Sequence, residues 1–299
     1  MNKTNLKTIL YRLLGNRIGN ALVYYKQYHK LPNQANPTLF NEKIQLLKRT
    51  AYAHNPIFTT CADKYKVREF LTSKGFEEIL VPLIACYDSP EQVDFHELPN
   101  RFVIKANFGN GMNIVVNDKN KENFNSITSK LKEWMKVKPE LISGEMQYAR
   151  IPKKIIVEEN ISEGNDAPID YKFHCAKGKC IMGFTVANRD TSNCSLYAFD
   201  ADLNPIDYEV STGKKFNYVN KAPEEFTAEN VQRMMTLAER ISTSFPYVRV
   251  DLFFVRGRIY FSELTFSEGG GFDKKTSFAD KLLGDAIDLG LYDLSKIRK

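Results

Sequence analysis

The sequence predicts an α+β protein built from mixed helix-and-strand lobes. Its 299 residues are 43% hydrophobic and 26% charged, which is typical of a folded, soluble chain long enough for two or three lobes. Apolar runs of strand length alternate with segments of helical periodicity, but without the strict strand–helix–strand repeat of a doubly wound sheet. No apolar run reaches the roughly 18 residues of a membrane span, so we expect no transmembrane helix.

The amino-terminal segment, residues 1–38, is expected to be a basic amphipathic helix. The first acidic residue is Glu42, and the basic residues before it account for the whole net charge of +6. Two interpretations stay open: the helix packs on the body of the protein, or residues 1–30 rest on an anionic inner membrane surface. The bases are Lys3, Lys7, Arg12, Arg17, Lys26 and Lys30, and the residues at helical spacing are Leu6, Ile9, Leu10, Leu13 and Leu14.

Several other classes of protein are not expected. Arg12 interrupts the first apolar run and no cleavage site follows, which argues against a signal peptide. No base-stacking motif accompanies the positive charge, so we expect no nucleic-acid partner. The five cysteines include no Cys-x-x-Cys pair, and the spacing of His174, Cys175 and Cys180 fits no common zinc site. Free thiols are typical of a reduced, cytoplasmic protein.

Helix and strand patterns alternate through the first half of the chain. Pro56 and Gly75 punctuate two helices, and short apolar runs mark the strands. The expected elements are helices over 41–54 and 60–75, strands over 79–87, 101–108 and 114–116, a helix over 121–138 and a strand over 154–161.

The second half is expected to be richer in strands, although residues 189–226 carry no motif that we can interpret. Glycines mark the turns and one loop. The expected elements are two strands over 170–188 about a Lys-Gly-Lys turn, a helix over 227–244, a hairpin over 248–265, the loop SEGGGF over 267–272 and a helix from near Phe278.

The hairpin VRVDLFFVRGRIYFSELT places charges in an otherwise apolar stretch. If its loop is 256–258, Asp251 faces Glu263 and Arg249 faces Thr265, all on one side of the sheet. A two-residue loop would instead move Glu263 to the opposite face, so the shared face depends on the turn type. Under the first register, the apolar end of the face is Phe253, Val255, Ile259 and Phe261.

Asp251 and Glu263 are candidate magnesium ligands. Two carboxylates at a cross-strand distance of about 5–6 Å repel each other unless a cation lies between them. Mg²⁺ suits the position, because it takes one or two carboxylates together with phosphate oxygens and water. The alternative is a pair of partnered surface acids.

Upstream lysines and glycines point to phosphate binding. Lys105 lies inside an apolar strand, where an unpaired ammonium group is unfavourable. The loop GNGMN over 109–113 follows, and its backbone N–H groups suit phosphates, although no Gly-Lys-Ser/Thr completes a Walker A motif. Lys64, on an expected helix, is by itself typical of a solvated face. The strand-end pair Glu158 and Glu159 suits an adenine amine or a ribose, or is ordinary exposed surface.

In this order, the residues resemble the ATP-grasp pattern: a lysine, a strand lysine with a mobile glycine-rich loop, hinge acids, and an Arg-x-Asp strand paired with a Glu-bearing strand. Over residues 39–289 the chain is similar to the TupA-like ATP-grasp group, named for a teichuronopeptide synthesis protein. The matching segments are LFNEKIQLLK, ADKYKVREFL, LPNRFVIKANFGNGMN, IIVEENI, DYKFHCAKGK, FPYVRVDLFFVRGRIYFSELTF and GGGF.

The resemblance implies an ATP-grasp fold, in which two α+β lobes grip ATP. It divides the chain after the helical segment 1–38 into three parts. These are an amino-terminal lobe over 39–100, a central subdomain with the glycine-rich lid over 101–156, and a carboxy-terminal subdomain with the magnesium site over 157–299.

The resemblance also implies a role for each candidate residue. Arg249, Lys105 and Lys172 act in catalysis, with Arg249 stabilising developing negative charge. Asp251, Glu263 and Thr265 hold Mg²⁺. Thr265 stands where many ATP-grasp enzymes have Asn, so a second metal would be absent, held through water or held by Glu268. The ATP-binding set is Lys64, Lys105, Gly109, Asn110, Gly111, Met112, Asn113, Glu158, Glu159, Asp170 and Lys172, and Gly269, Gly270 and Gly271 shape the acceptor side.

The implied activity is that of a carbon–nitrogen ligase that uses ATP and Mg²⁺. The group is associated with capsule and O-antigen assembly, so we expect an amino acid or amine and a uronic-acid-containing glycan, free or lipid-linked, as substrates. The protein would act in the cytoplasm or at the inner face of the plasma membrane. Two alternatives stay open: an ATP-grasp kinase that phosphorylates a sugar or small molecule, and a non-catalytic nucleotide-binding scaffold of glycan assembly.

Overall fold

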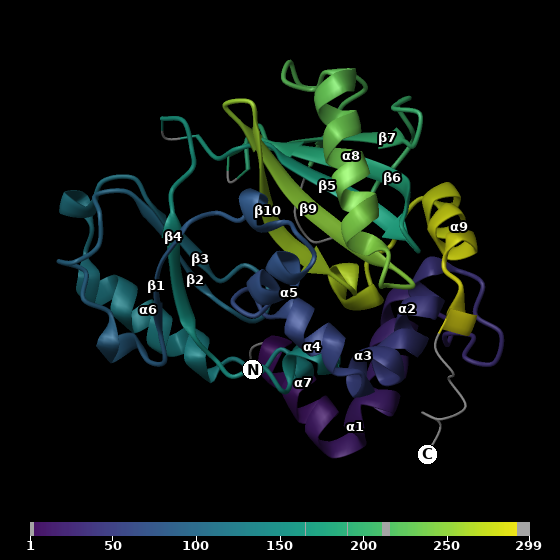
Figure 1. Cartoon of the computed structure of the whole chain (residues 1–299). Helices are drawn as coiled ribbons and strands as arrows, with labels where there is room; N and C mark the ends of the chain where they lie inside the picture. The colour runs from purple at the N-terminus through teal and green to yellow at the C-terminus, as the bar shows by residue number, and fades with distance from the viewer. Residues whose placement is uncertain (1–2, 165, 190, 211–215, 292–299) are drawn as a thin grey trace.

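The computed structural model describes residues 3–164, 166–189, 191–210 and 216–291. Within these residues the strands form two sheets, one of four strands and one of six. Figure 1 shows the smaller sheet, blue to teal, on one side of the molecule and the larger sheet, teal-green to yellow, on the other. The purple and blue amino-terminal helices lie along one end of both sheets. Helices packed on two separate sheets confirm the predicted α+β class.

A group of helices precedes the first strand. The expected amino-terminal helix is present, and it breaks at Gly15, whose φ of 71° is accessible to glycine but not to most residues. The helices are α1 (Lys3–Tyr28), α2 (Phe40–Arg49), α3 (Ala51–His54), α4 (Pro56–Ala62) and α5 (Val67–Ser73). None of the described helices is long and apolar enough to cross a bilayer.

The single helix predicted over 41–54 is wrong in its extent. The chain breaks at Thr50, with φ −114° and ψ −98°, so α2 and α3 are separate. A new helix begins at Pro56, because proline fits the first helical turn and disfavours helix in the residue before it. The Asn55 side chain caps this helix by accepting a hydrogen bond from the N–H of Ile57 at 3.1 Å.

The helix predicted over 60–75 is also interrupted, at the position of a candidate site residue. The Asp63 side chain accepts hydrogen bonds from the N–H groups of Tyr65 at 2.8 Å and Lys66 at 3.3 Å. Such local side-chain bonds compete with helix formation, and a turn separates α4 from α5. Lys64 therefore lies on this turn and not on a helix.

The smaller sheet is antiparallel, with strands in the order β1-β4-β2-β3. The predicted strand over 79–87 begins only at Leu83, because residues 77–79 form a 3₁₀ turn and Pro82 has no N–H to donate. The boundary predicted at 156 falls inside β4, so that division does not correspond to a separate sheet. The elements are β1 (Leu83–Tyr87), β2 (Phe102–Ala106), β3 (Asn113–Val116), β4 (Ile155–Glu159) and the covering helix α6 (Phe124–Lys136).

The larger sheet has the order β10-β9-β5-β6-β7-β8 and is antiparallel except for β7 beside β8. Helix α8 (Ala228–Ser242) packs on one face, and α9 (Ser277–Ala286) lies near α2. Both helices were predicted, whereas β7 and β8 lie in the stretch without an interpretable motif. The strands are β5 (Asp170–Ala176), β6 (Lys179–Ala187), β7 (Ser195–Asp200), β8 (Asn217–Tyr218), β9 (Val248–Val255) and β10 (Arg258–Thr265).

The β9–β10 hairpin has the predicted pairing of its charged residues, but its turn and its strand pairing near the turn differ from the prediction. Its loop has two residues, Arg256 and Gly257, both with positive φ, so Val255 pairs with Arg258 and not with Ile259. A register shift at Ser262 then adds one residue to β10. The final pairs are those predicted, Glu263 with Asp251 and Thr265 with Arg249.

The loop predicted over 256–258 is therefore wrong, and so is part of the predicted apolar end. Ile259 and Phe261 pair with Phe254 and Leu252, which places them on the face opposite Asp251. The charged end keeps its predicted face because the bulge compensates for the shorter loop.

Candidate active site

Charged side chains from three strands meet on one face of the larger sheet. Arg249 and Asp251 come from β9, Glu263 comes from β10, and Lys172 of β5 pairs with Asp251 in the register. Side chains alternate along each strand, so the intervening residues point to the opposite face. Helix α8 packs on these strands, and the buried residues there are Tyr171, Phe173, Val250 and Leu252.

Asp251 is fully buried and bound by two cations. Arg249 donates from Nε to Oδ1 at 2.7 Å and from Nη2 to Oδ2 at 2.8 Å, and Lys172 Nζ donates to Oδ2 at 2.5 Å. Burial alone would raise the pKa of Asp251, but the charges and hydrogen bonds of Arg249 and Lys172 outweigh burial and lower it. Asp251 is therefore held ionised, with one lone-pair position on Oδ1 open.

Glu268 holds the other side of Arg249. Its Oε1 accepts a hydrogen bond from Arg249 Nη1 at 2.8 Å, and its Oε2 lies 2.8 Å from Lys275 Nζ and accepts from the Tyr208 hydroxyl at 3.2 Å. Burial would raise the pKa of Glu268, but the adjacent cations, Lys275 foremost, hold it well below its usual value. The carboxylate considered as a ligand for a second metal therefore already has three partners.

His174 lies beside this cluster as a neutral imidazole. It is fully buried, and its Nδ1 shares a hydrogen bond with the Tyr247 hydroxyl at 2.8 Å. Burial lowers the pKa of His174 to about 4, because the surrounding protein cannot solvate an imidazolium. The 3.8 Å separation between His174 Nε2 and Glu268 Oε1 is therefore not an ion pair at neutral pH.

Lys64 connects the two sheets. Asp63 accepts a hydrogen bond from Asn107 Nδ2 at 2.8 Å, and the Lys64 N–H donates to the Asn107 carbonyl at 2.8 Å, so the turn is fixed to the end of β2. The Lys64 ammonium donates to the Gly109 carbonyl at 2.7 Å and lies 3.6 Å from Glu263 Oε2. The glycine-rich loop and the Glu263 carboxylate are thus within reach of one cation.

The smaller sheet contributes its own charged group. Lys105 Nζ donates to Glu158 Oε2 at 2.6 Å, and Arg68 Nη1 donates to Oε1 at 3.2 Å. The predicted lysine and one hinge acid therefore bind each other in this structure. Glu159 is exposed and lines a cavity of about 410 Å³ together with Asn160 and neighbouring hinge residues, and with Val255, Arg256 and Tyr260 of the hairpin.

The predicted glycine-rich loop, 109–113, joins β2 to β3. Gly109 has φ +67°, and a Cβ there would lie 2.7 Å from Met112 Cε and 3.2 Å from Pro139 Cγ. Gly111 has φ +71° with open space around it, and Asn110 and Gly111 are exposed. Conformation alone therefore favours glycine at both positions, and the exposed tip is accessible to a phosphate.

Asp170 lies at the start of β5, on the same face as Lys172. It is buried between Lys172 Nζ, which donates to Oδ1 at 3.5 Å, and the guanidinium of Arg189, which donates to Oδ2. The resemblance places Asp170 in the ATP-binding set, but both of its carboxylate oxygens already have protein partners in this structure. Arg189 is a new, partly exposed cation at this edge of the site.

The glycines of the acceptor loop pack against the protein itself. Residues Glu268–Gly271 form a 3₁₀ turn, and a Cβ on Gly271 would lie 2.7 Å from both Gln45 and Ile44 of α2. Gln45 Nε2 donates to the Gly271 carbonyl at 2.7 Å, and Lys48 Nζ donates to the Gly270 carbonyl at 2.7 Å. Helix α2 therefore fixes the loop predicted to shape the acceptor side.

The donor set fits magnesium if phosphate supplies the remaining ligands. Glu263 keeps both carboxylate oxygens accessible, since its nearest cations, Lys64 and Arg249, are 3.6 and 3.7 Å away. Asp251 offers one further lone pair, and Thr265 donates to Glu263 Oε1 at 3.4 Å. Within the described ranges no three His, Cys, Asp or Glu side chains gather into a metal cluster. A Mg²⁺ ion bound by one or two carboxylates and phosphate oxygens is consistent with this set.

Several cations of the site were not predicted from the sequence. Arg68 belongs to the quoted segment ADKYKVREFL, one helical turn beyond Lys64, and that spacing was the available signal. Arg189 and Lys275 lie next to no motif, and their partners become neighbours only in the folded chain. Lys48 is fully buried on α2, and its position in the helical pattern did not indicate that burial.

A family described as TupA-like ATP-grasp has a model that matches residues 42–288. The chain belongs to the TupA-like ATP-grasp family. The predicted resemblance and ATP-grasp fold are both confirmed. No curated protein sequence matched the chain.

Solved ATP-grasp ligases are similar to this family member in fold. D-alanine–D-alanine ligase from Bacillus anthracis complexed with ATP is 16% identical, with a TM-score of 0.46 over 76% of this chain and 65% of that one. L-amino acid ligase from Bacillus licheniformis is 13% identical, with a TM-score of 0.43 over 77% and 49%. The ligase PsnB, complexed with a precursor variant, Mg and ADP, is 12% identical, with a TM-score of 0.40 over 85% and 60%. The chain thus spans less than two thirds of each of these proteins.

Proposed function

We propose that this TupA-like ATP-grasp protein is an ATP-dependent carboxylate–amine ligase that forms an amide through an acyl phosphate. The observation that carries the proposal is the position of Lys64. Its ammonium lies 2.7 Å from the Gly109 carbonyl of the glycine-rich loop and 3.6 Å from the Glu263 carboxylate of the larger sheet. A triphosphate between the two lobes would therefore contact the loop, the lysine and the metal-binding carboxylate together.

The reaction has two steps. A substrate carboxylate oxygen attacks the γ-phosphorus of ATP, the bond from this phosphorus to the bridging oxygen breaks, and ADP leaves. The amine nitrogen then attacks the acyl carbon, the bond from that carbon to the phosphate oxygen breaks, and inorganic phosphate departs with the proton that the nitrogen loses. Positioning and charge neutralisation account for most of the catalysis in such transfers.

The residues of the chain divide this work between them. Lys64, Lys105 and Lys172 would neutralise phosphate oxygens, and Lys105 would exchange its contact with Glu158 for one with phosphate. Arg249 is held by Asp251 and Glu268, so its charge is fixed before the reaction begins. Glu263, with Asp251 behind it, would hold Mg²⁺, and the ion would supply positive charge against the phosphates. The 109–113 loop would cover the acyl phosphate and exclude water.

For the substrates we propose an amino acid and a hexuronic acid of a bacterial surface polysaccharide. The family's association with capsule and O-antigen assembly supports this pair. So does Arg189, which adds a partly exposed guanidinium beside Lys172 and Asp170. Guanidinium groups bind carboxylates through two parallel hydrogen bonds, which suits an anionic sugar.

ADP release from Mg-ATP, measured against the proteinogenic amino acids with and without glucuronic and galacturonic acid derivatives, tests this proposal. We expect release only when an amine and a uronic acid are both present, with an amide product by mass spectrometry. Glu263→Gln should reduce the release about 100-fold, whereas Glu229→Gln, at an exposed position on α8, should leave it unchanged. ADP release with a single hydroxyl compound and a stable phosphorylated product would identify a kinase. Unchanged nucleotide turnover in Asp251→Ala would point to a scaffold.

A further inference from the structure

Helix α1 exposes an unusual amount of apolar surface. Of the eleven large hydrophobic side chains exposed among the described residues, seven lie between positions 9 and 31, and Leu13 alone is 77% exposed. Single exposed apolar residues are ordinary, but several gathered on one segment mark an interaction surface. Six of the seven lie on the two halves of α1, and Leu31 follows its end. The seven are Ile9, Leu13, Leu14, Ile18, Leu22, Tyr25 and Leu31.

The body of the protein accounts for only one side of this helix. Tyr24 is fully buried, and Asn20 accepts hydrogen bonds from the Tyr11 hydroxyl at 2.8 Å and from Lys48 Nζ at 3.4 Å. A Cβ on Gly19 would lie 2.7 Å from the Tyr11 ring, so the two halves of α1 pack closely about the break at Gly15. The side of α1 that carries Asn20 and Tyr24 packs on the protein. The apolar side chains on the other side have no partner within the described residues.

The outward stripe is regular. Ile18, Leu22 and Tyr25 follow each other at i, i+4 and i+7, which places them on one line along the second half of α1. The buried residues Asn20 and Tyr24 lie on the opposite side of the same turns. Helical geometry therefore separates the face that packs on the protein from the apolar face that it exposes.

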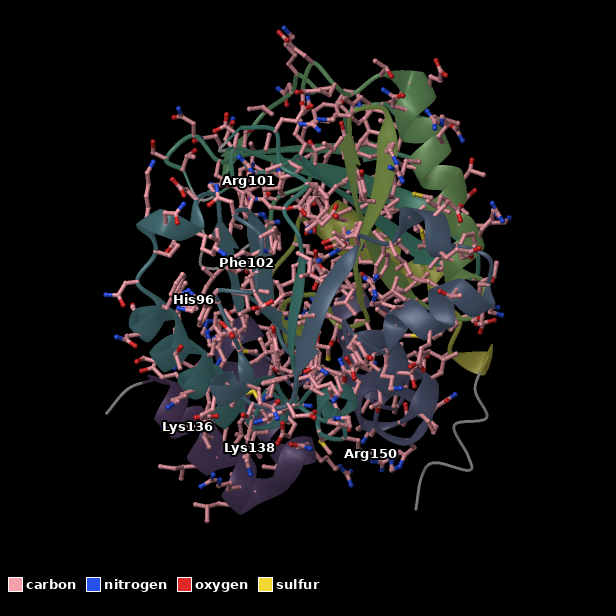
Figure 2. The ribbon with its side chains drawn as sticks, turned by 60° about the vertical axis from the view of Figure 1, so that its left-hand side comes forward. His96, Arg101, Phe102, Lys136, Lys138 and Arg150 are labelled. Carbon is pink, nitrogen blue, oxygen red and sulfur yellow. The ribbon has the colours of Figure 1, made fainter. Side chains whose placement is uncertain are left out.

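The charges around the stripe have one sign. Lys7, Arg12, Arg17, Lys26 and Lys30 are exposed, and no acidic residue precedes Glu42 in the sequence. Figure 2 labels further exposed bases, Lys136, Lys138 and Arg150, at the end of the molecule where α1 lies. Helix α7 (Glu140–Ser143) packs on α1 and adds one acid, Glu140, to this end. The surface is thus apolar at its centre and basic around it.

We propose that this face of α1 docks the protein on an anionic bilayer surface. An apolar stripe that enters the headgroup region, flanked by bases that meet anionic lipid, is the design of an interfacial helix. Each base near such a surface contributes attraction that falls as salt rises. A bound protein would then present its α1 end to the lipid.

Sedimentation of the full chain with lipid vesicles tests the proposal. We expect binding to vesicles of phosphatidylcholine mixed with phosphatidylglycerol, weaker binding to phosphatidylcholine alone, and loss of binding as salt increases. Replacing Arg12, Arg17 and Lys26 together by Gln should weaken binding to the anionic vesicles by about 100-fold. The matched control replaces Lys179, Lys221 and Arg233, exposed bases of the other lobe, and should bind normally.

A second variant tests the apolar stripe itself. Leu13, Ile18 and Leu22 replaced together by Gln should lose vesicle binding, whereas Val115→Gln with Phe278→Gln, exposed apolar positions elsewhere, should keep it. Thermal unfolding of every variant checks that the fold is intact. Wild-type protein that fails to bind anionic vesicles overturns the proposal. So does a wild-type dimer that the Leu13, Ile18 and Leu22 variant converts to a monomer, because a second copy would then cover the stripe.

Discussion

The charged groups of the two sheets are held in different ways. In the smaller sheet Lys105 shares the buried carboxylate of Glu158 with Arg68 of α5, and the side chains of the two cations are 19% and 18% exposed. In the larger sheet Asp251 is completely buried, and both of its cations, Lys172 and Arg249, are almost so. The cations of the smaller-sheet group keep contact with water, whereas the larger-sheet cluster is almost fully shielded from water.

This difference indicates how the two lobes respond to a ligand. A buried ion cluster is fixed by many partners, and removing one leaves an uncompensated charge in the interior. The Lys105 ammonium reaches water, and Glu158 keeps Arg68 as a partner, so phosphate can replace Glu158 as the partner of Lys105 at small cost. We expect the larger sheet to be preorganised and the smaller sheet to exchange partners when ATP binds.

The largest effect should come from opening the buried cluster. Asp251→Ala leaves Arg249 and Lys172 without their shared carboxylate, and we expect the free energy of unfolding to fall by about 3–5 kcal/mol. Urea unfolding measures this loss. Asp202→Ala, at an exposed position, serves as the control. A loss below about 1 kcal/mol would show that the larger sheet does not depend on its ion cluster.

Acid should act first on the larger sheet, through His174. Burial lowers the pKa of His174 to about 4. Between pH 6.5 and 4 this imidazole is therefore protonated in the unfolded chain and neutral in the folded chain. The contribution of His174 to stability is therefore complete above about pH 6.5 and falls by about 1.4 kcal/mol per pH unit as pH decreases toward 4. Asp251 and Glu268, whose pKa values are lowered, contribute stability that is lost only below about pH 4.

Urea unfolding at a series of pH values tests the His174 effect. Between pH 6.5 and 4, His174→Asn should lose about 1.4 kcal/mol less stability per pH unit than the wild type, whereas His54→Asn, at an exposed position, should match the wild type. If His174→Asn loses stability on acidification as steeply as the wild type, another group is responsible.

Glu263 should separate activity from stability. Its side chain is 26% exposed and its cations lie beyond hydrogen-bond distance, so Glu263→Gln should change the free energy of unfolding by less than about 1 kcal/mol. Loss of the metal-binding charge should reduce ADP release about 100-fold. Titration of activity with Mg²⁺ then distinguishes weak metal binding from misfolding. An unchanged rate would remove Glu263 from the site.

The smallest effect should come from the smaller sheet. Lys105→Met leaves Glu158 paired with Arg68, so stability should be nearly unchanged, while KM for ATP should rise about tenfold for one lost phosphate contact. Steady-state kinetics measure this change, with Lys179→Met as the control. A large loss of stability with an unchanged KM would contradict the difference between the two sheets.

The sequence predicted the residue pairs of the hairpin better than its backbone. Asp251 faces Glu263 as expected, but a two-residue turn and an extra residue at Ser262 combine to give that result. Alternation of side chains is a strong constraint where one face is buried, whereas turn length and bulges depend on local backbone geometry. The charged face was therefore predictable and the path of the chain was not.

The candidate site was predictable where a residue type conflicts with its surroundings. A lysine or aspartate inside an apolar strand is visible in the sequence, as at Lys105 and Asp251. Arg189 and Lys275 gave no such signal, because ion pairs that join distant segments form only in the folded chain. Lys64 was identified through the family pattern. Its contacts depend on a turn, where the helical periodicity of the sequence predicted a continuous helix.

The central claim is that two lobes meeting at Lys64 activate a carboxylate with ATP. Hydroxylamine trapping tests it most directly, because hydroxylamine converts an acyl phosphate to a stable hydroxamate. With Mg-ATP and a uronic acid that supports ADP release, we expect hydroxamate in proportion to ADP, and about 100-fold less of both with Glu263→Gln. Release of ADP with no hydroxamate and a phosphorylated product stable to hydroxylamine would contradict the claim.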